Sequence, residues 1–80
     1  MTNIYSIKDT KIGFSTIFTA PNNFVAIRMF ADTCEQSDTL FAKHPEDFEI
    51  YKLGELNDES GEIKPEVTYL ERATTFMKGK

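Results

Sequence analysis

The sequence has very few of the residues from which disulfide frameworks and metal centres are built. Its 80 residues contain one cysteine, Cys34, and one histidine, His44. A lone cysteine cannot form an internal disulfide, and a zinc site needs several such ligands at close spacing. We therefore expect no bound metal, and a reducing, intracellular setting in which a free thiol persists.

Long apolar runs are also absent. A membrane-spanning helix needs about 20 consecutive apolar residues, and no stretch of the chain approaches that length. The first residues, MTNIYSIKDTK, have neither the basic start nor the apolar centre of an export signal. We expect a soluble protein that is not exported, has no membrane partner and folds as a single domain over residues 1–80.

The chain lacks the motifs of enzyme active sites. Its four glycines are too scattered to form a phosphate-binding loop. Cys34 falls on the apolar face of a predicted helix, where a thiol is usually buried and unreactive. His44 could act as a base beside Glu46 and Asp47, but its position before Pro45 is typical of a turn at the surface. We expect a nonenzymatic protein without a cofactor.

The net charge of −4 is unevenly distributed along the chain. Residues 1–31 contain three basic residues and one acidic residue, whereas residues 32–71 contain twelve acidic and three basic residues. Nucleic-acid binding draws on a basic surface, because phosphate neutralisation supplies much of the affinity. Any basic patch must therefore be local, and the N-terminal part is where it can form.

The first half of the sequence predicts a hairpin followed by a helix. Residues 3–8 and 14–19 are rich in β-branched and aromatic residues, which are typical of strands. Asp9 and Gly13 favour a turn between them, and Asn22 is suited to cap a helix. The helix has one apolar face, which we expect to pack on the sheet. Its residues are Phe24, Ile27, Phe30, Ala31 and Cys34.

The segment from residue 46 to 65 predicts a second hairpin. Its first strand, FEIYKLGEL over residues 48–56, is partly apolar on both faces, as in a central strand or one that meets another molecule. A turn follows, in which Gly61 can adopt a left-handed conformation. The return strand is short, residues 62–64, because Pro65 cannot donate to the ladder.

The last part of the sequence predicts a second helix over residues 65–77, on the spacing of Val67, Leu70, Ala73 and Met77. In the connector before the second hairpin, Leu40 and Phe41 are expected to pack beneath the fold. The predicted fold class is α+β: a small antiparallel sheet of about four strands with two helices, in the order β-β-α-β-β-α.

One predicted surface is a sheet face that combines aromatic and basic side chains. Such a face can stack on bases while its cations neutralise phosphates. The candidate nucleic-acid contacts are Tyr5, Lys8, Lys11, Arg28, Tyr51 and Lys52.

A second predicted surface is an exposed strand edge or apolar patch that pairs with another copy of the chain or with another protein. The small size of the chain favours oligomerisation, because a core of this size supplies roughly 3–5 kcal/mol of net stability. The candidate protein contacts are Phe48, Ile50, Leu53 and Leu56.

Three segments in order, HPEDF at 44–48, YKLGE at 51–55 and NDESG at 57–61, resemble a known family. They are similar to the small nonstructural protein of gokushovirus-type microviruses, which are small single-stranded DNA phages. The resemblance covers most of residues 3–65. It extends to residues 4–9, 26–30 and 37–41.

The resemblance implies a phage-encoded protein made in the host cytoplasm and absent from the mature virion. Members of that family are often described as DNA-binding, with a suggested part in single-stranded genome synthesis or packaging. The implied partners are single-stranded DNA and phage or host proteins of replication or packaging. The acidic middle of the chain keeps an alternative open: a homo-oligomeric scaffold or host-factor-binding module with no DNA contact.

Overall fold

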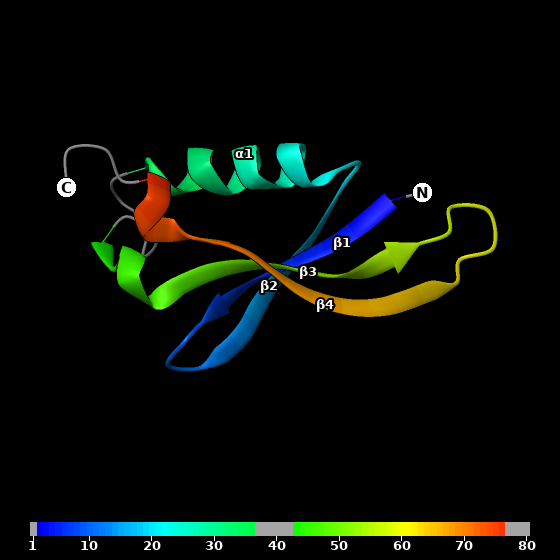
Figure 1. The fold of residues 1–80 in the computed structure, drawn as a ribbon, viewed down its shortest axis with the longest axis horizontal. Helices are drawn as coiled ribbons and strands as arrows, with labels where there is room; N and C mark the ends of the chain where they lie inside the picture. The colour runs from blue at the N-terminus through cyan, green and yellow to red at the C-terminus, as the bar shows by residue number, and fades with distance from the viewer. Residues whose placement is uncertain (1, 37–42, 77–80) are drawn as a thin grey trace.

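The computed structural model describes residues 2–36 and 43–76, and most of them are in β-strands (Figure 1). Leu40 and Phe41 lie outside the described residues. The elements in chain order are β1 (Thr2–Asp9), β2 (Gly13–Ala20), α1 (Asn23–Cys34), the short 3-10 helix η1 (Pro45–Asp47), β3 (Phe48–Leu56), β4 (Ile63–Arg72) and the 3-10 helix η2 (Ala73–Phe76).

The four strands form one antiparallel sheet in the order β2-β1-β3-β4. The first hairpin lies where the sequence predicts it, and Gly13 in its turn has a φ of 120°, which a residue without a Cβ adopts readily. The Ser15 hydroxyl donates to the Ile7 carbonyl at 3.1 Å, next to a register shift between β1 and β2. The sheet is strongly twisted, so the β1–β2 and β3–β4 hairpins cross in Figure 1.

The predicted fold class is wrong in its last element. Residues 65–72 belong to β4, and the described residues contain one α-helix, α1, together with the two 3-10 turns. Met77, the predicted end of the second helix, lies outside the described residues. The spacing that predicted a helix competes with a period of two, in which Val67 and Tyr69 share one side of the strand. Val-Thr-Tyr is a strand-forming run, and its pairing with β3 decides the outcome.

Pro65 was predicted to end the second hairpin, but it lies inside β4. A proline is tolerated there because β4 is an edge strand and needs to bond on one side only. Pro65 pairs with Gly54 of β3, and its Cα would lie 3.1 Å from a Cβ added to Gly54. Such a Cβ would also collide with the Lys64 carbonyl oxygen. Gly54 therefore lets β4 approach β3 closely enough to pair past the proline.

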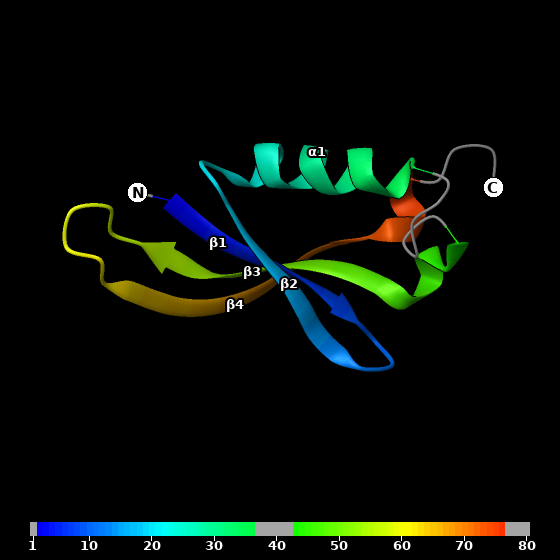
Figure 2. The same cartoon turned by 180° about the vertical axis from the view of Figure 1, so that it is seen from behind.

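Helix α1 covers one face of the sheet (Figures 1 and 2). The predicted cap is confirmed, since the Asn22 side chain accepts a hydrogen bond from the Val25 amide at 2.9 Å. Ala26 and Phe30 are buried toward the sheet, whereas Phe24, predicted on the apolar face, is 86% exposed. No helix within the described residues is long and apolar enough to cross a membrane.

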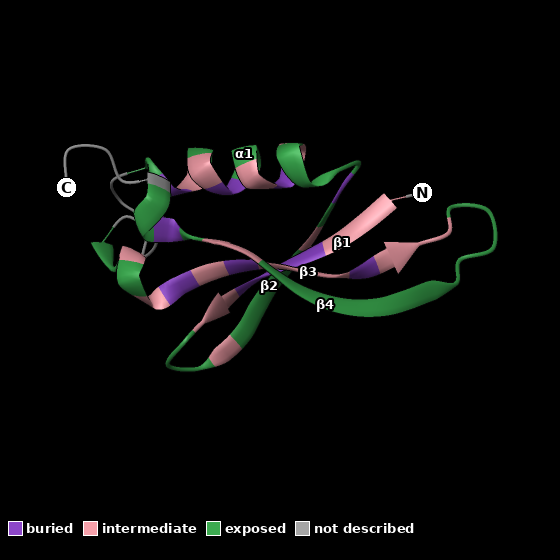
Figure 3. Ribbon diagram, in the orientation of Figure 1, coloured by how far each residue is buried: buried purple, intermediate pink, exposed green. Residues whose placement is uncertain are grey.

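The core lies between α1 and the covered face of the sheet. Its buried residues come from the middle of β1, the end of β2, parts of β3 and α1, and the start of η2 (Figure 3). Most of β4 is exposed (Figure 3). The buried residues are Tyr5, Ile7, Ala20, Ala26, Phe30, Cys34, Phe48, Ile50 and Ala73.

The close approach of β3 and β4 at Gly54 gives a stability prediction. Gly54→Ala should lower the free energy of unfolding by about 1–3 kcal/mol, because the added Cβ forces the two strands apart. Urea unfolding followed by circular dichroism measures the change. Thr68→Ala, at an exposed position of β4, is the control and should cost less than about 1 kcal/mol. Equal stabilities of Gly54→Ala and the unsubstituted protein would contradict this contact.

Cys34 gives a second prediction. Its side chain is fully buried, and this burial, followed by the charge of Glu35, raises the pKa of the thiol from 9.0 to about 11. The reactive thiolate is therefore about a hundredfold scarcer near neutral pH than for an ordinary cysteine. A thiol reagent at pH 8 should label the folded protein at least about a hundredfold more slowly than the urea-unfolded protein. Equal rates would show that α1 does not bury Cys34.

Candidate functional site

The face of the sheet opposite α1 is not covered by any element of residues 2–36 and 43–76 (Figures 1 and 2). Side chains alternate between the two faces along a strand, so the pairing register identifies the residues that share this face. Two rows of paired residues cross all four strands, and we call them together the open face. From β2 to β4, the first row is Ile17, Ser6, Tyr51 and Tyr69, and the second is Phe14, Lys8, Glu49 and Arg72.

Three aromatic rings lie in contact on the open face. The ring centroids of Phe14 and Tyr51 are 5.2 Å apart at an interplanar angle of 81°, and those of Tyr51 and Tyr69 are 5.5 Å apart at 75°. These edge-to-face contacts fix the rings relative to one another. Phe14 and Tyr69 are 47% and 45% exposed. The outer two rings therefore present aromatic surface to a ligand, while Tyr51 supports them from the centre.

Lys8 places a positive charge over this aromatic cluster. Its Nζ atom lies 5.7 Å from the ring centroids of both Phe14 and Tyr51, a distance at which an ammonium group is attracted to the ring face. Lys8 pairs across the strands with Phe14 on one side and Glu49 on the other. A cation and aromatic surface thus lie together on the open face.

Glu49 is the acidic residue of the two rows, and it lies between Lys8 and Arg72. It accepts a hydrogen bond from the Tyr51 hydroxyl at 3.2 Å. Burial of that hydroxyl, followed by the nearby charge of Glu49, raises the pKa of Tyr51, so the phenol stays neutral at physiological pH. A side-chain hydrogen bond to Tyr69 raises the pKa of Arg72. The open face therefore carries two cations, with one carboxylate between them.

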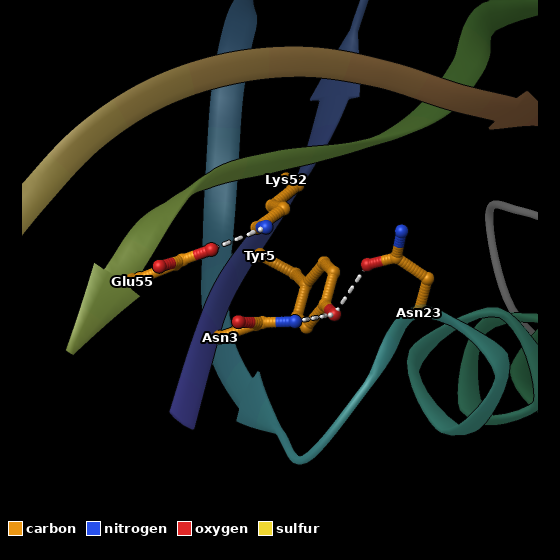
Figure 4. Close-up of polar contacts among 5 residues, drawn as sticks. All are labelled: Asn3, Tyr5, Asn23, Lys52 and Glu55. Atoms are coloured by element: carbon orange, nitrogen blue, oxygen red, sulfur yellow. Dashed lines mark hydrogen bonds and ion pairs between the residues drawn. The ribbon is translucent and has the colours of Figure 1, made fainter. Parts of the chain in front are cut away.

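Tyr5 and Lys52, both predicted as nucleic-acid contacts, lie on the covered face (Figure 4). Tyr5 is fully buried; its hydroxyl donates to Asn23 Oδ1 at 2.7 Å and accepts from Asn3 Nδ2 at 3.0 Å. Lys52 Nζ lies 3.0 Å from Glu55 Oε2, and this hydrogen bond raises the pKa of Lys52 and lowers that of Glu55. The sheet therefore separates both residues from Lys8, and the buried Tyr5 ring is not available for stacking on a base.

The other predicted cations lie apart from the aromatic cluster. Lys11 is exposed in the turn between β1 and β2, where its Nζ lies 3.7 Å from Asp47 Oδ1. Arg28 is exposed on α1, on the far side of the sheet from Lys8. Of the six predicted nucleic-acid contacts, the open face brings together Lys8 and Tyr51.

The four predicted protein contacts, all in β3, are divided between the core and the partly exposed surface. Phe48 and Ile50 are 6% and 0% exposed and belong to the core beneath α1. Leu53 and Leu56 are partly buried, and Leu56 pairs with Ile63 near the end of the β3–β4 hairpin. Phe48 and Ile50 are thus occupied within the fold, and Leu53 and Leu56 retain some exposed surface.

Several residues of the open face were missed from the sequence. Tyr69 and Arg72 were assigned to a helix, although the alternation of Val67 and Tyr69 was the signal that could have placed them on a strand. Phe14 and Ile17 were assigned to a strand but not to a surface, because sequence spacing does not show which face of a hairpin a helix covers. These four residues, together with Ser6 and Glu49, complete the open face around Lys8 and Tyr51.

A separate group of possible metal ligands lies at η1. One ligand atom each from His44, Glu46 and Asp47 lies within 4.8 Å of the others. His44 and Glu46 are exposed, and Asp47 is in contact with Lys11. Exposed donors that already have a cationic neighbour are weak ligands compared with a buried, converging set. The group is on a different surface element from the aromatic cluster.

The sequence model of the family described as Phage ORF5 protein matches residues 2–76, a range that includes all four strands of the open face. No curated protein and no solved structure matches the chain significantly. Because the match extends over nearly the whole chain, the chain belongs to the Phage ORF5 protein family.

Proposed function

We propose that this phage protein is a nonenzymatic accessory factor that contacts single-stranded DNA weakly through its open face during genome replication or packaging. The observation that carries the proposal is the contact of three aromatic rings, Phe14, Tyr51 and Tyr69, with Lys8 above two of them. The resemblance to the nonstructural protein of gokushovirus-type microviruses supports a single-stranded genome as the substrate. On the same resemblance, we propose that the protein acts in the host cytoplasm and is absent from the mature virion.

Stacking is the interaction that the open face is best suited to supply. Every base has an aromatic face, so stacking on protein rings is tolerant of sequence and contributes about 1–3 kcal/mol per base. Phe14 and Tyr69 each expose nearly half of their surface, on opposite sides of the central Tyr51. Single-stranded DNA fits this arrangement better than duplex DNA, whose bases are already stacked on one another.

Electrostatics limit the strength of the contact. Lys8 and Arg72 can each neutralise a phosphate, but Glu49 lies between them and the chain carries a net charge of −4. Each phosphate that is neutralised on a single strand contributes about −0.7 to the slope of log K against log salt concentration. Two cations therefore predict a shallow salt dependence, unlike that of a basic protein that coats DNA.

A second candidate function is protein binding with no DNA contact, either as a homo-oligomeric scaffold or as a module that binds a phage or host replication or packaging protein. The observation that favours it is the apolar surface at the two margins of the same face. Ile17 of β2 is 65% exposed, and Ile63 and Val67 of β4 are 60% and 66% exposed. Exposed apolar residues that gather on one surface mark interaction sites.

Fluorescence anisotropy with a labelled oligothymidine separates the two candidates. The titration starts at about 10 mM salt, where the Debye length is about 30 Å and weak electrostatic contacts are least screened. Phe14→Ala should weaken binding about fivefold or more, because it removes a stacking surface. Lys8→Gln should weaken binding and make the salt slope shallower.

Matched controls come from α1. Phe24→Ala removes an exposed phenylalanine, and Arg28→Gln an exposed cation, from the far side of the sheet, so both variants should bind like the unsubstituted protein. Absence of binding at about 10 mM salt would exclude the DNA contact. Equal losses in the Phe14 and Phe24 variants would exclude the open face as its location.

A further inference from the structure

The strand order β2-β1-β3-β4 leaves β2 and β4 as the two edges of the sheet. β2 bonds to β1 on its inner side. No backbone group on its outer side is bonded to another residue of the described chain. An unpaired strand edge is a template for adding a further strand, and natural proteins usually protect it with charges, prolines or irregular pairing.

β2 has almost none of these protections. Its sequence, GFSTIFTA, contains no charged residue and no proline. Residues 14–17 and Thr19 are exposed, and Phe18 is partly buried. The irregularity in its pairing with β1 falls at residues 15 and 16, opposite Ile7. It leaves residues 17–20 as a regularly paired stretch that is rich in strand-forming residues. A long, uncharged and exposed strand of this kind is prone to pair with another strand.

β4 has all three of these protections, whereas β2 has one register shift and neither a charge nor a proline. β4 contains Pro65 and the charged residues Lys64, Glu66, Glu71 and Arg72. Its ladder with β3 has two register shifts, which twist the edge locally. The two edges of one sheet therefore differ in whether they permit addition of a strand.

We propose that β2 pairs antiparallel with β2 of a second copy of this chain, which joins two four-stranded sheets into one of eight strands. A second copy is the occupant that fits this uncharged edge, because β2 carries no charge that would repel β2 of another copy. β2 lies within residues 1–31, which carry a small net positive charge, whereas the acidic residues are concentrated in residues 32–71, so two β2 strands approach without a row of like charges between them.

The register that we propose has a two-fold axis perpendicular to the sheet at Phe18, within the regularly paired stretch of β2. It sets Ile17 of one copy opposite Thr19 of the other. This axis keeps both open faces on the same side, so the two aromatic clusters form one continuous surface. The dimer itself does not depend on DNA binding.

Cysteine cross-linking in the full chain tests the pairing. Opposed residues of an antiparallel pair have Cα atoms about 4.5–5.5 Å apart, within the range of about 4.4–6.8 Å that a disulfide spans. Under mild oxidation, Ile17→Cys mixed with Thr19→Cys should give a covalent dimer of twice 9.2 kDa. The native Cys34 is buried and should not cross-link. Val67→Cys is the matched control, since Val67 is 66% exposed and Ile17 is 65% exposed on the same face at opposite edges.

The outcomes separate the edge pairing from its alternatives. A dimer from the mixed Ile17→Cys and Thr19→Cys variants, without one from Val67→Cys, supports pairing through β2. Equal cross-linking of Val67→Cys would indicate face-to-face packing and overturn the proposal. A monomeric mass for the unsubstituted protein by light scattering at millimolar concentration would also overturn it. Because none of these measurements contains DNA, a failure here is distinct from a failure of the proposed DNA contact.

Discussion

One short helix against a longer sheet is the constraint on which the rest of this structure depends. The 12 residues of α1 extend about 18 Å, whereas β4, with 10 residues, extends roughly 33 Å. The helix can therefore cover one face of the sheet and only part of its length. The molecule is accordingly elongated, with extents of 43 × 23 × 18 Å, and the end of the β3–β4 hairpin projects beyond α1 (Figure 1).

The composition of the open face follows from the same constraint, because α1 covers only the other face of the sheet. Side chains that would be core in a two-layer sandwich remain at the surface, and among them are Phe14, Ile17, Val67 and Tyr69. Aromatic contacts and Lys8 hold part of this surface in a fixed arrangement without burying it. The result is a face with aromatic, apolar and a few cationic groups. It fits a weak, stacking-based ligand contact better than tight electrostatic capture.

Much of this fold could be predicted from the sequence, because local signals and tertiary pairing agree over the first half of the chain. The Asn22 cap, the glycine turn after β1 and the strand over residues 48–56 lie where they were predicted. The helix predicted over residues 65–72 is wrong because the spacing of the apolar residues fits both a helix and a strand, and Pro65 argued against a strand. What resolves that competition is Gly54 of β3, 11 residues before Pro65, because its missing side chain makes room for the proline.

The wrong prediction of a helix over residues 65–72 also kept part of the candidate site from being predicted. Lys8 and Tyr51 could be selected from composition and strand assignment, but Tyr69 and Arg72 reach the open face only when β4 exists. Tyr5 could not be separated from Tyr51 by sequence, because both are tyrosines in amphipathic strands and only the docking of α1 decides which one is buried. Pairing between distant strands therefore determined both the fold and the composition of the site.

The proposed function requires the bases of single-stranded DNA to stack on the aromatic rings of the open face. Its most direct test is a proton NMR titration of the aromatic side chains with a short, unlabelled oligothymidine. Stacked bases should shift the ring resonances of Phe14 and Tyr69, while those of Phe24 on α1 and of the buried Tyr5 stay in place. Shifts confined to Phe24 and other residues of α1, or no shift of any ring at millimolar oligonucleotide, would contradict it.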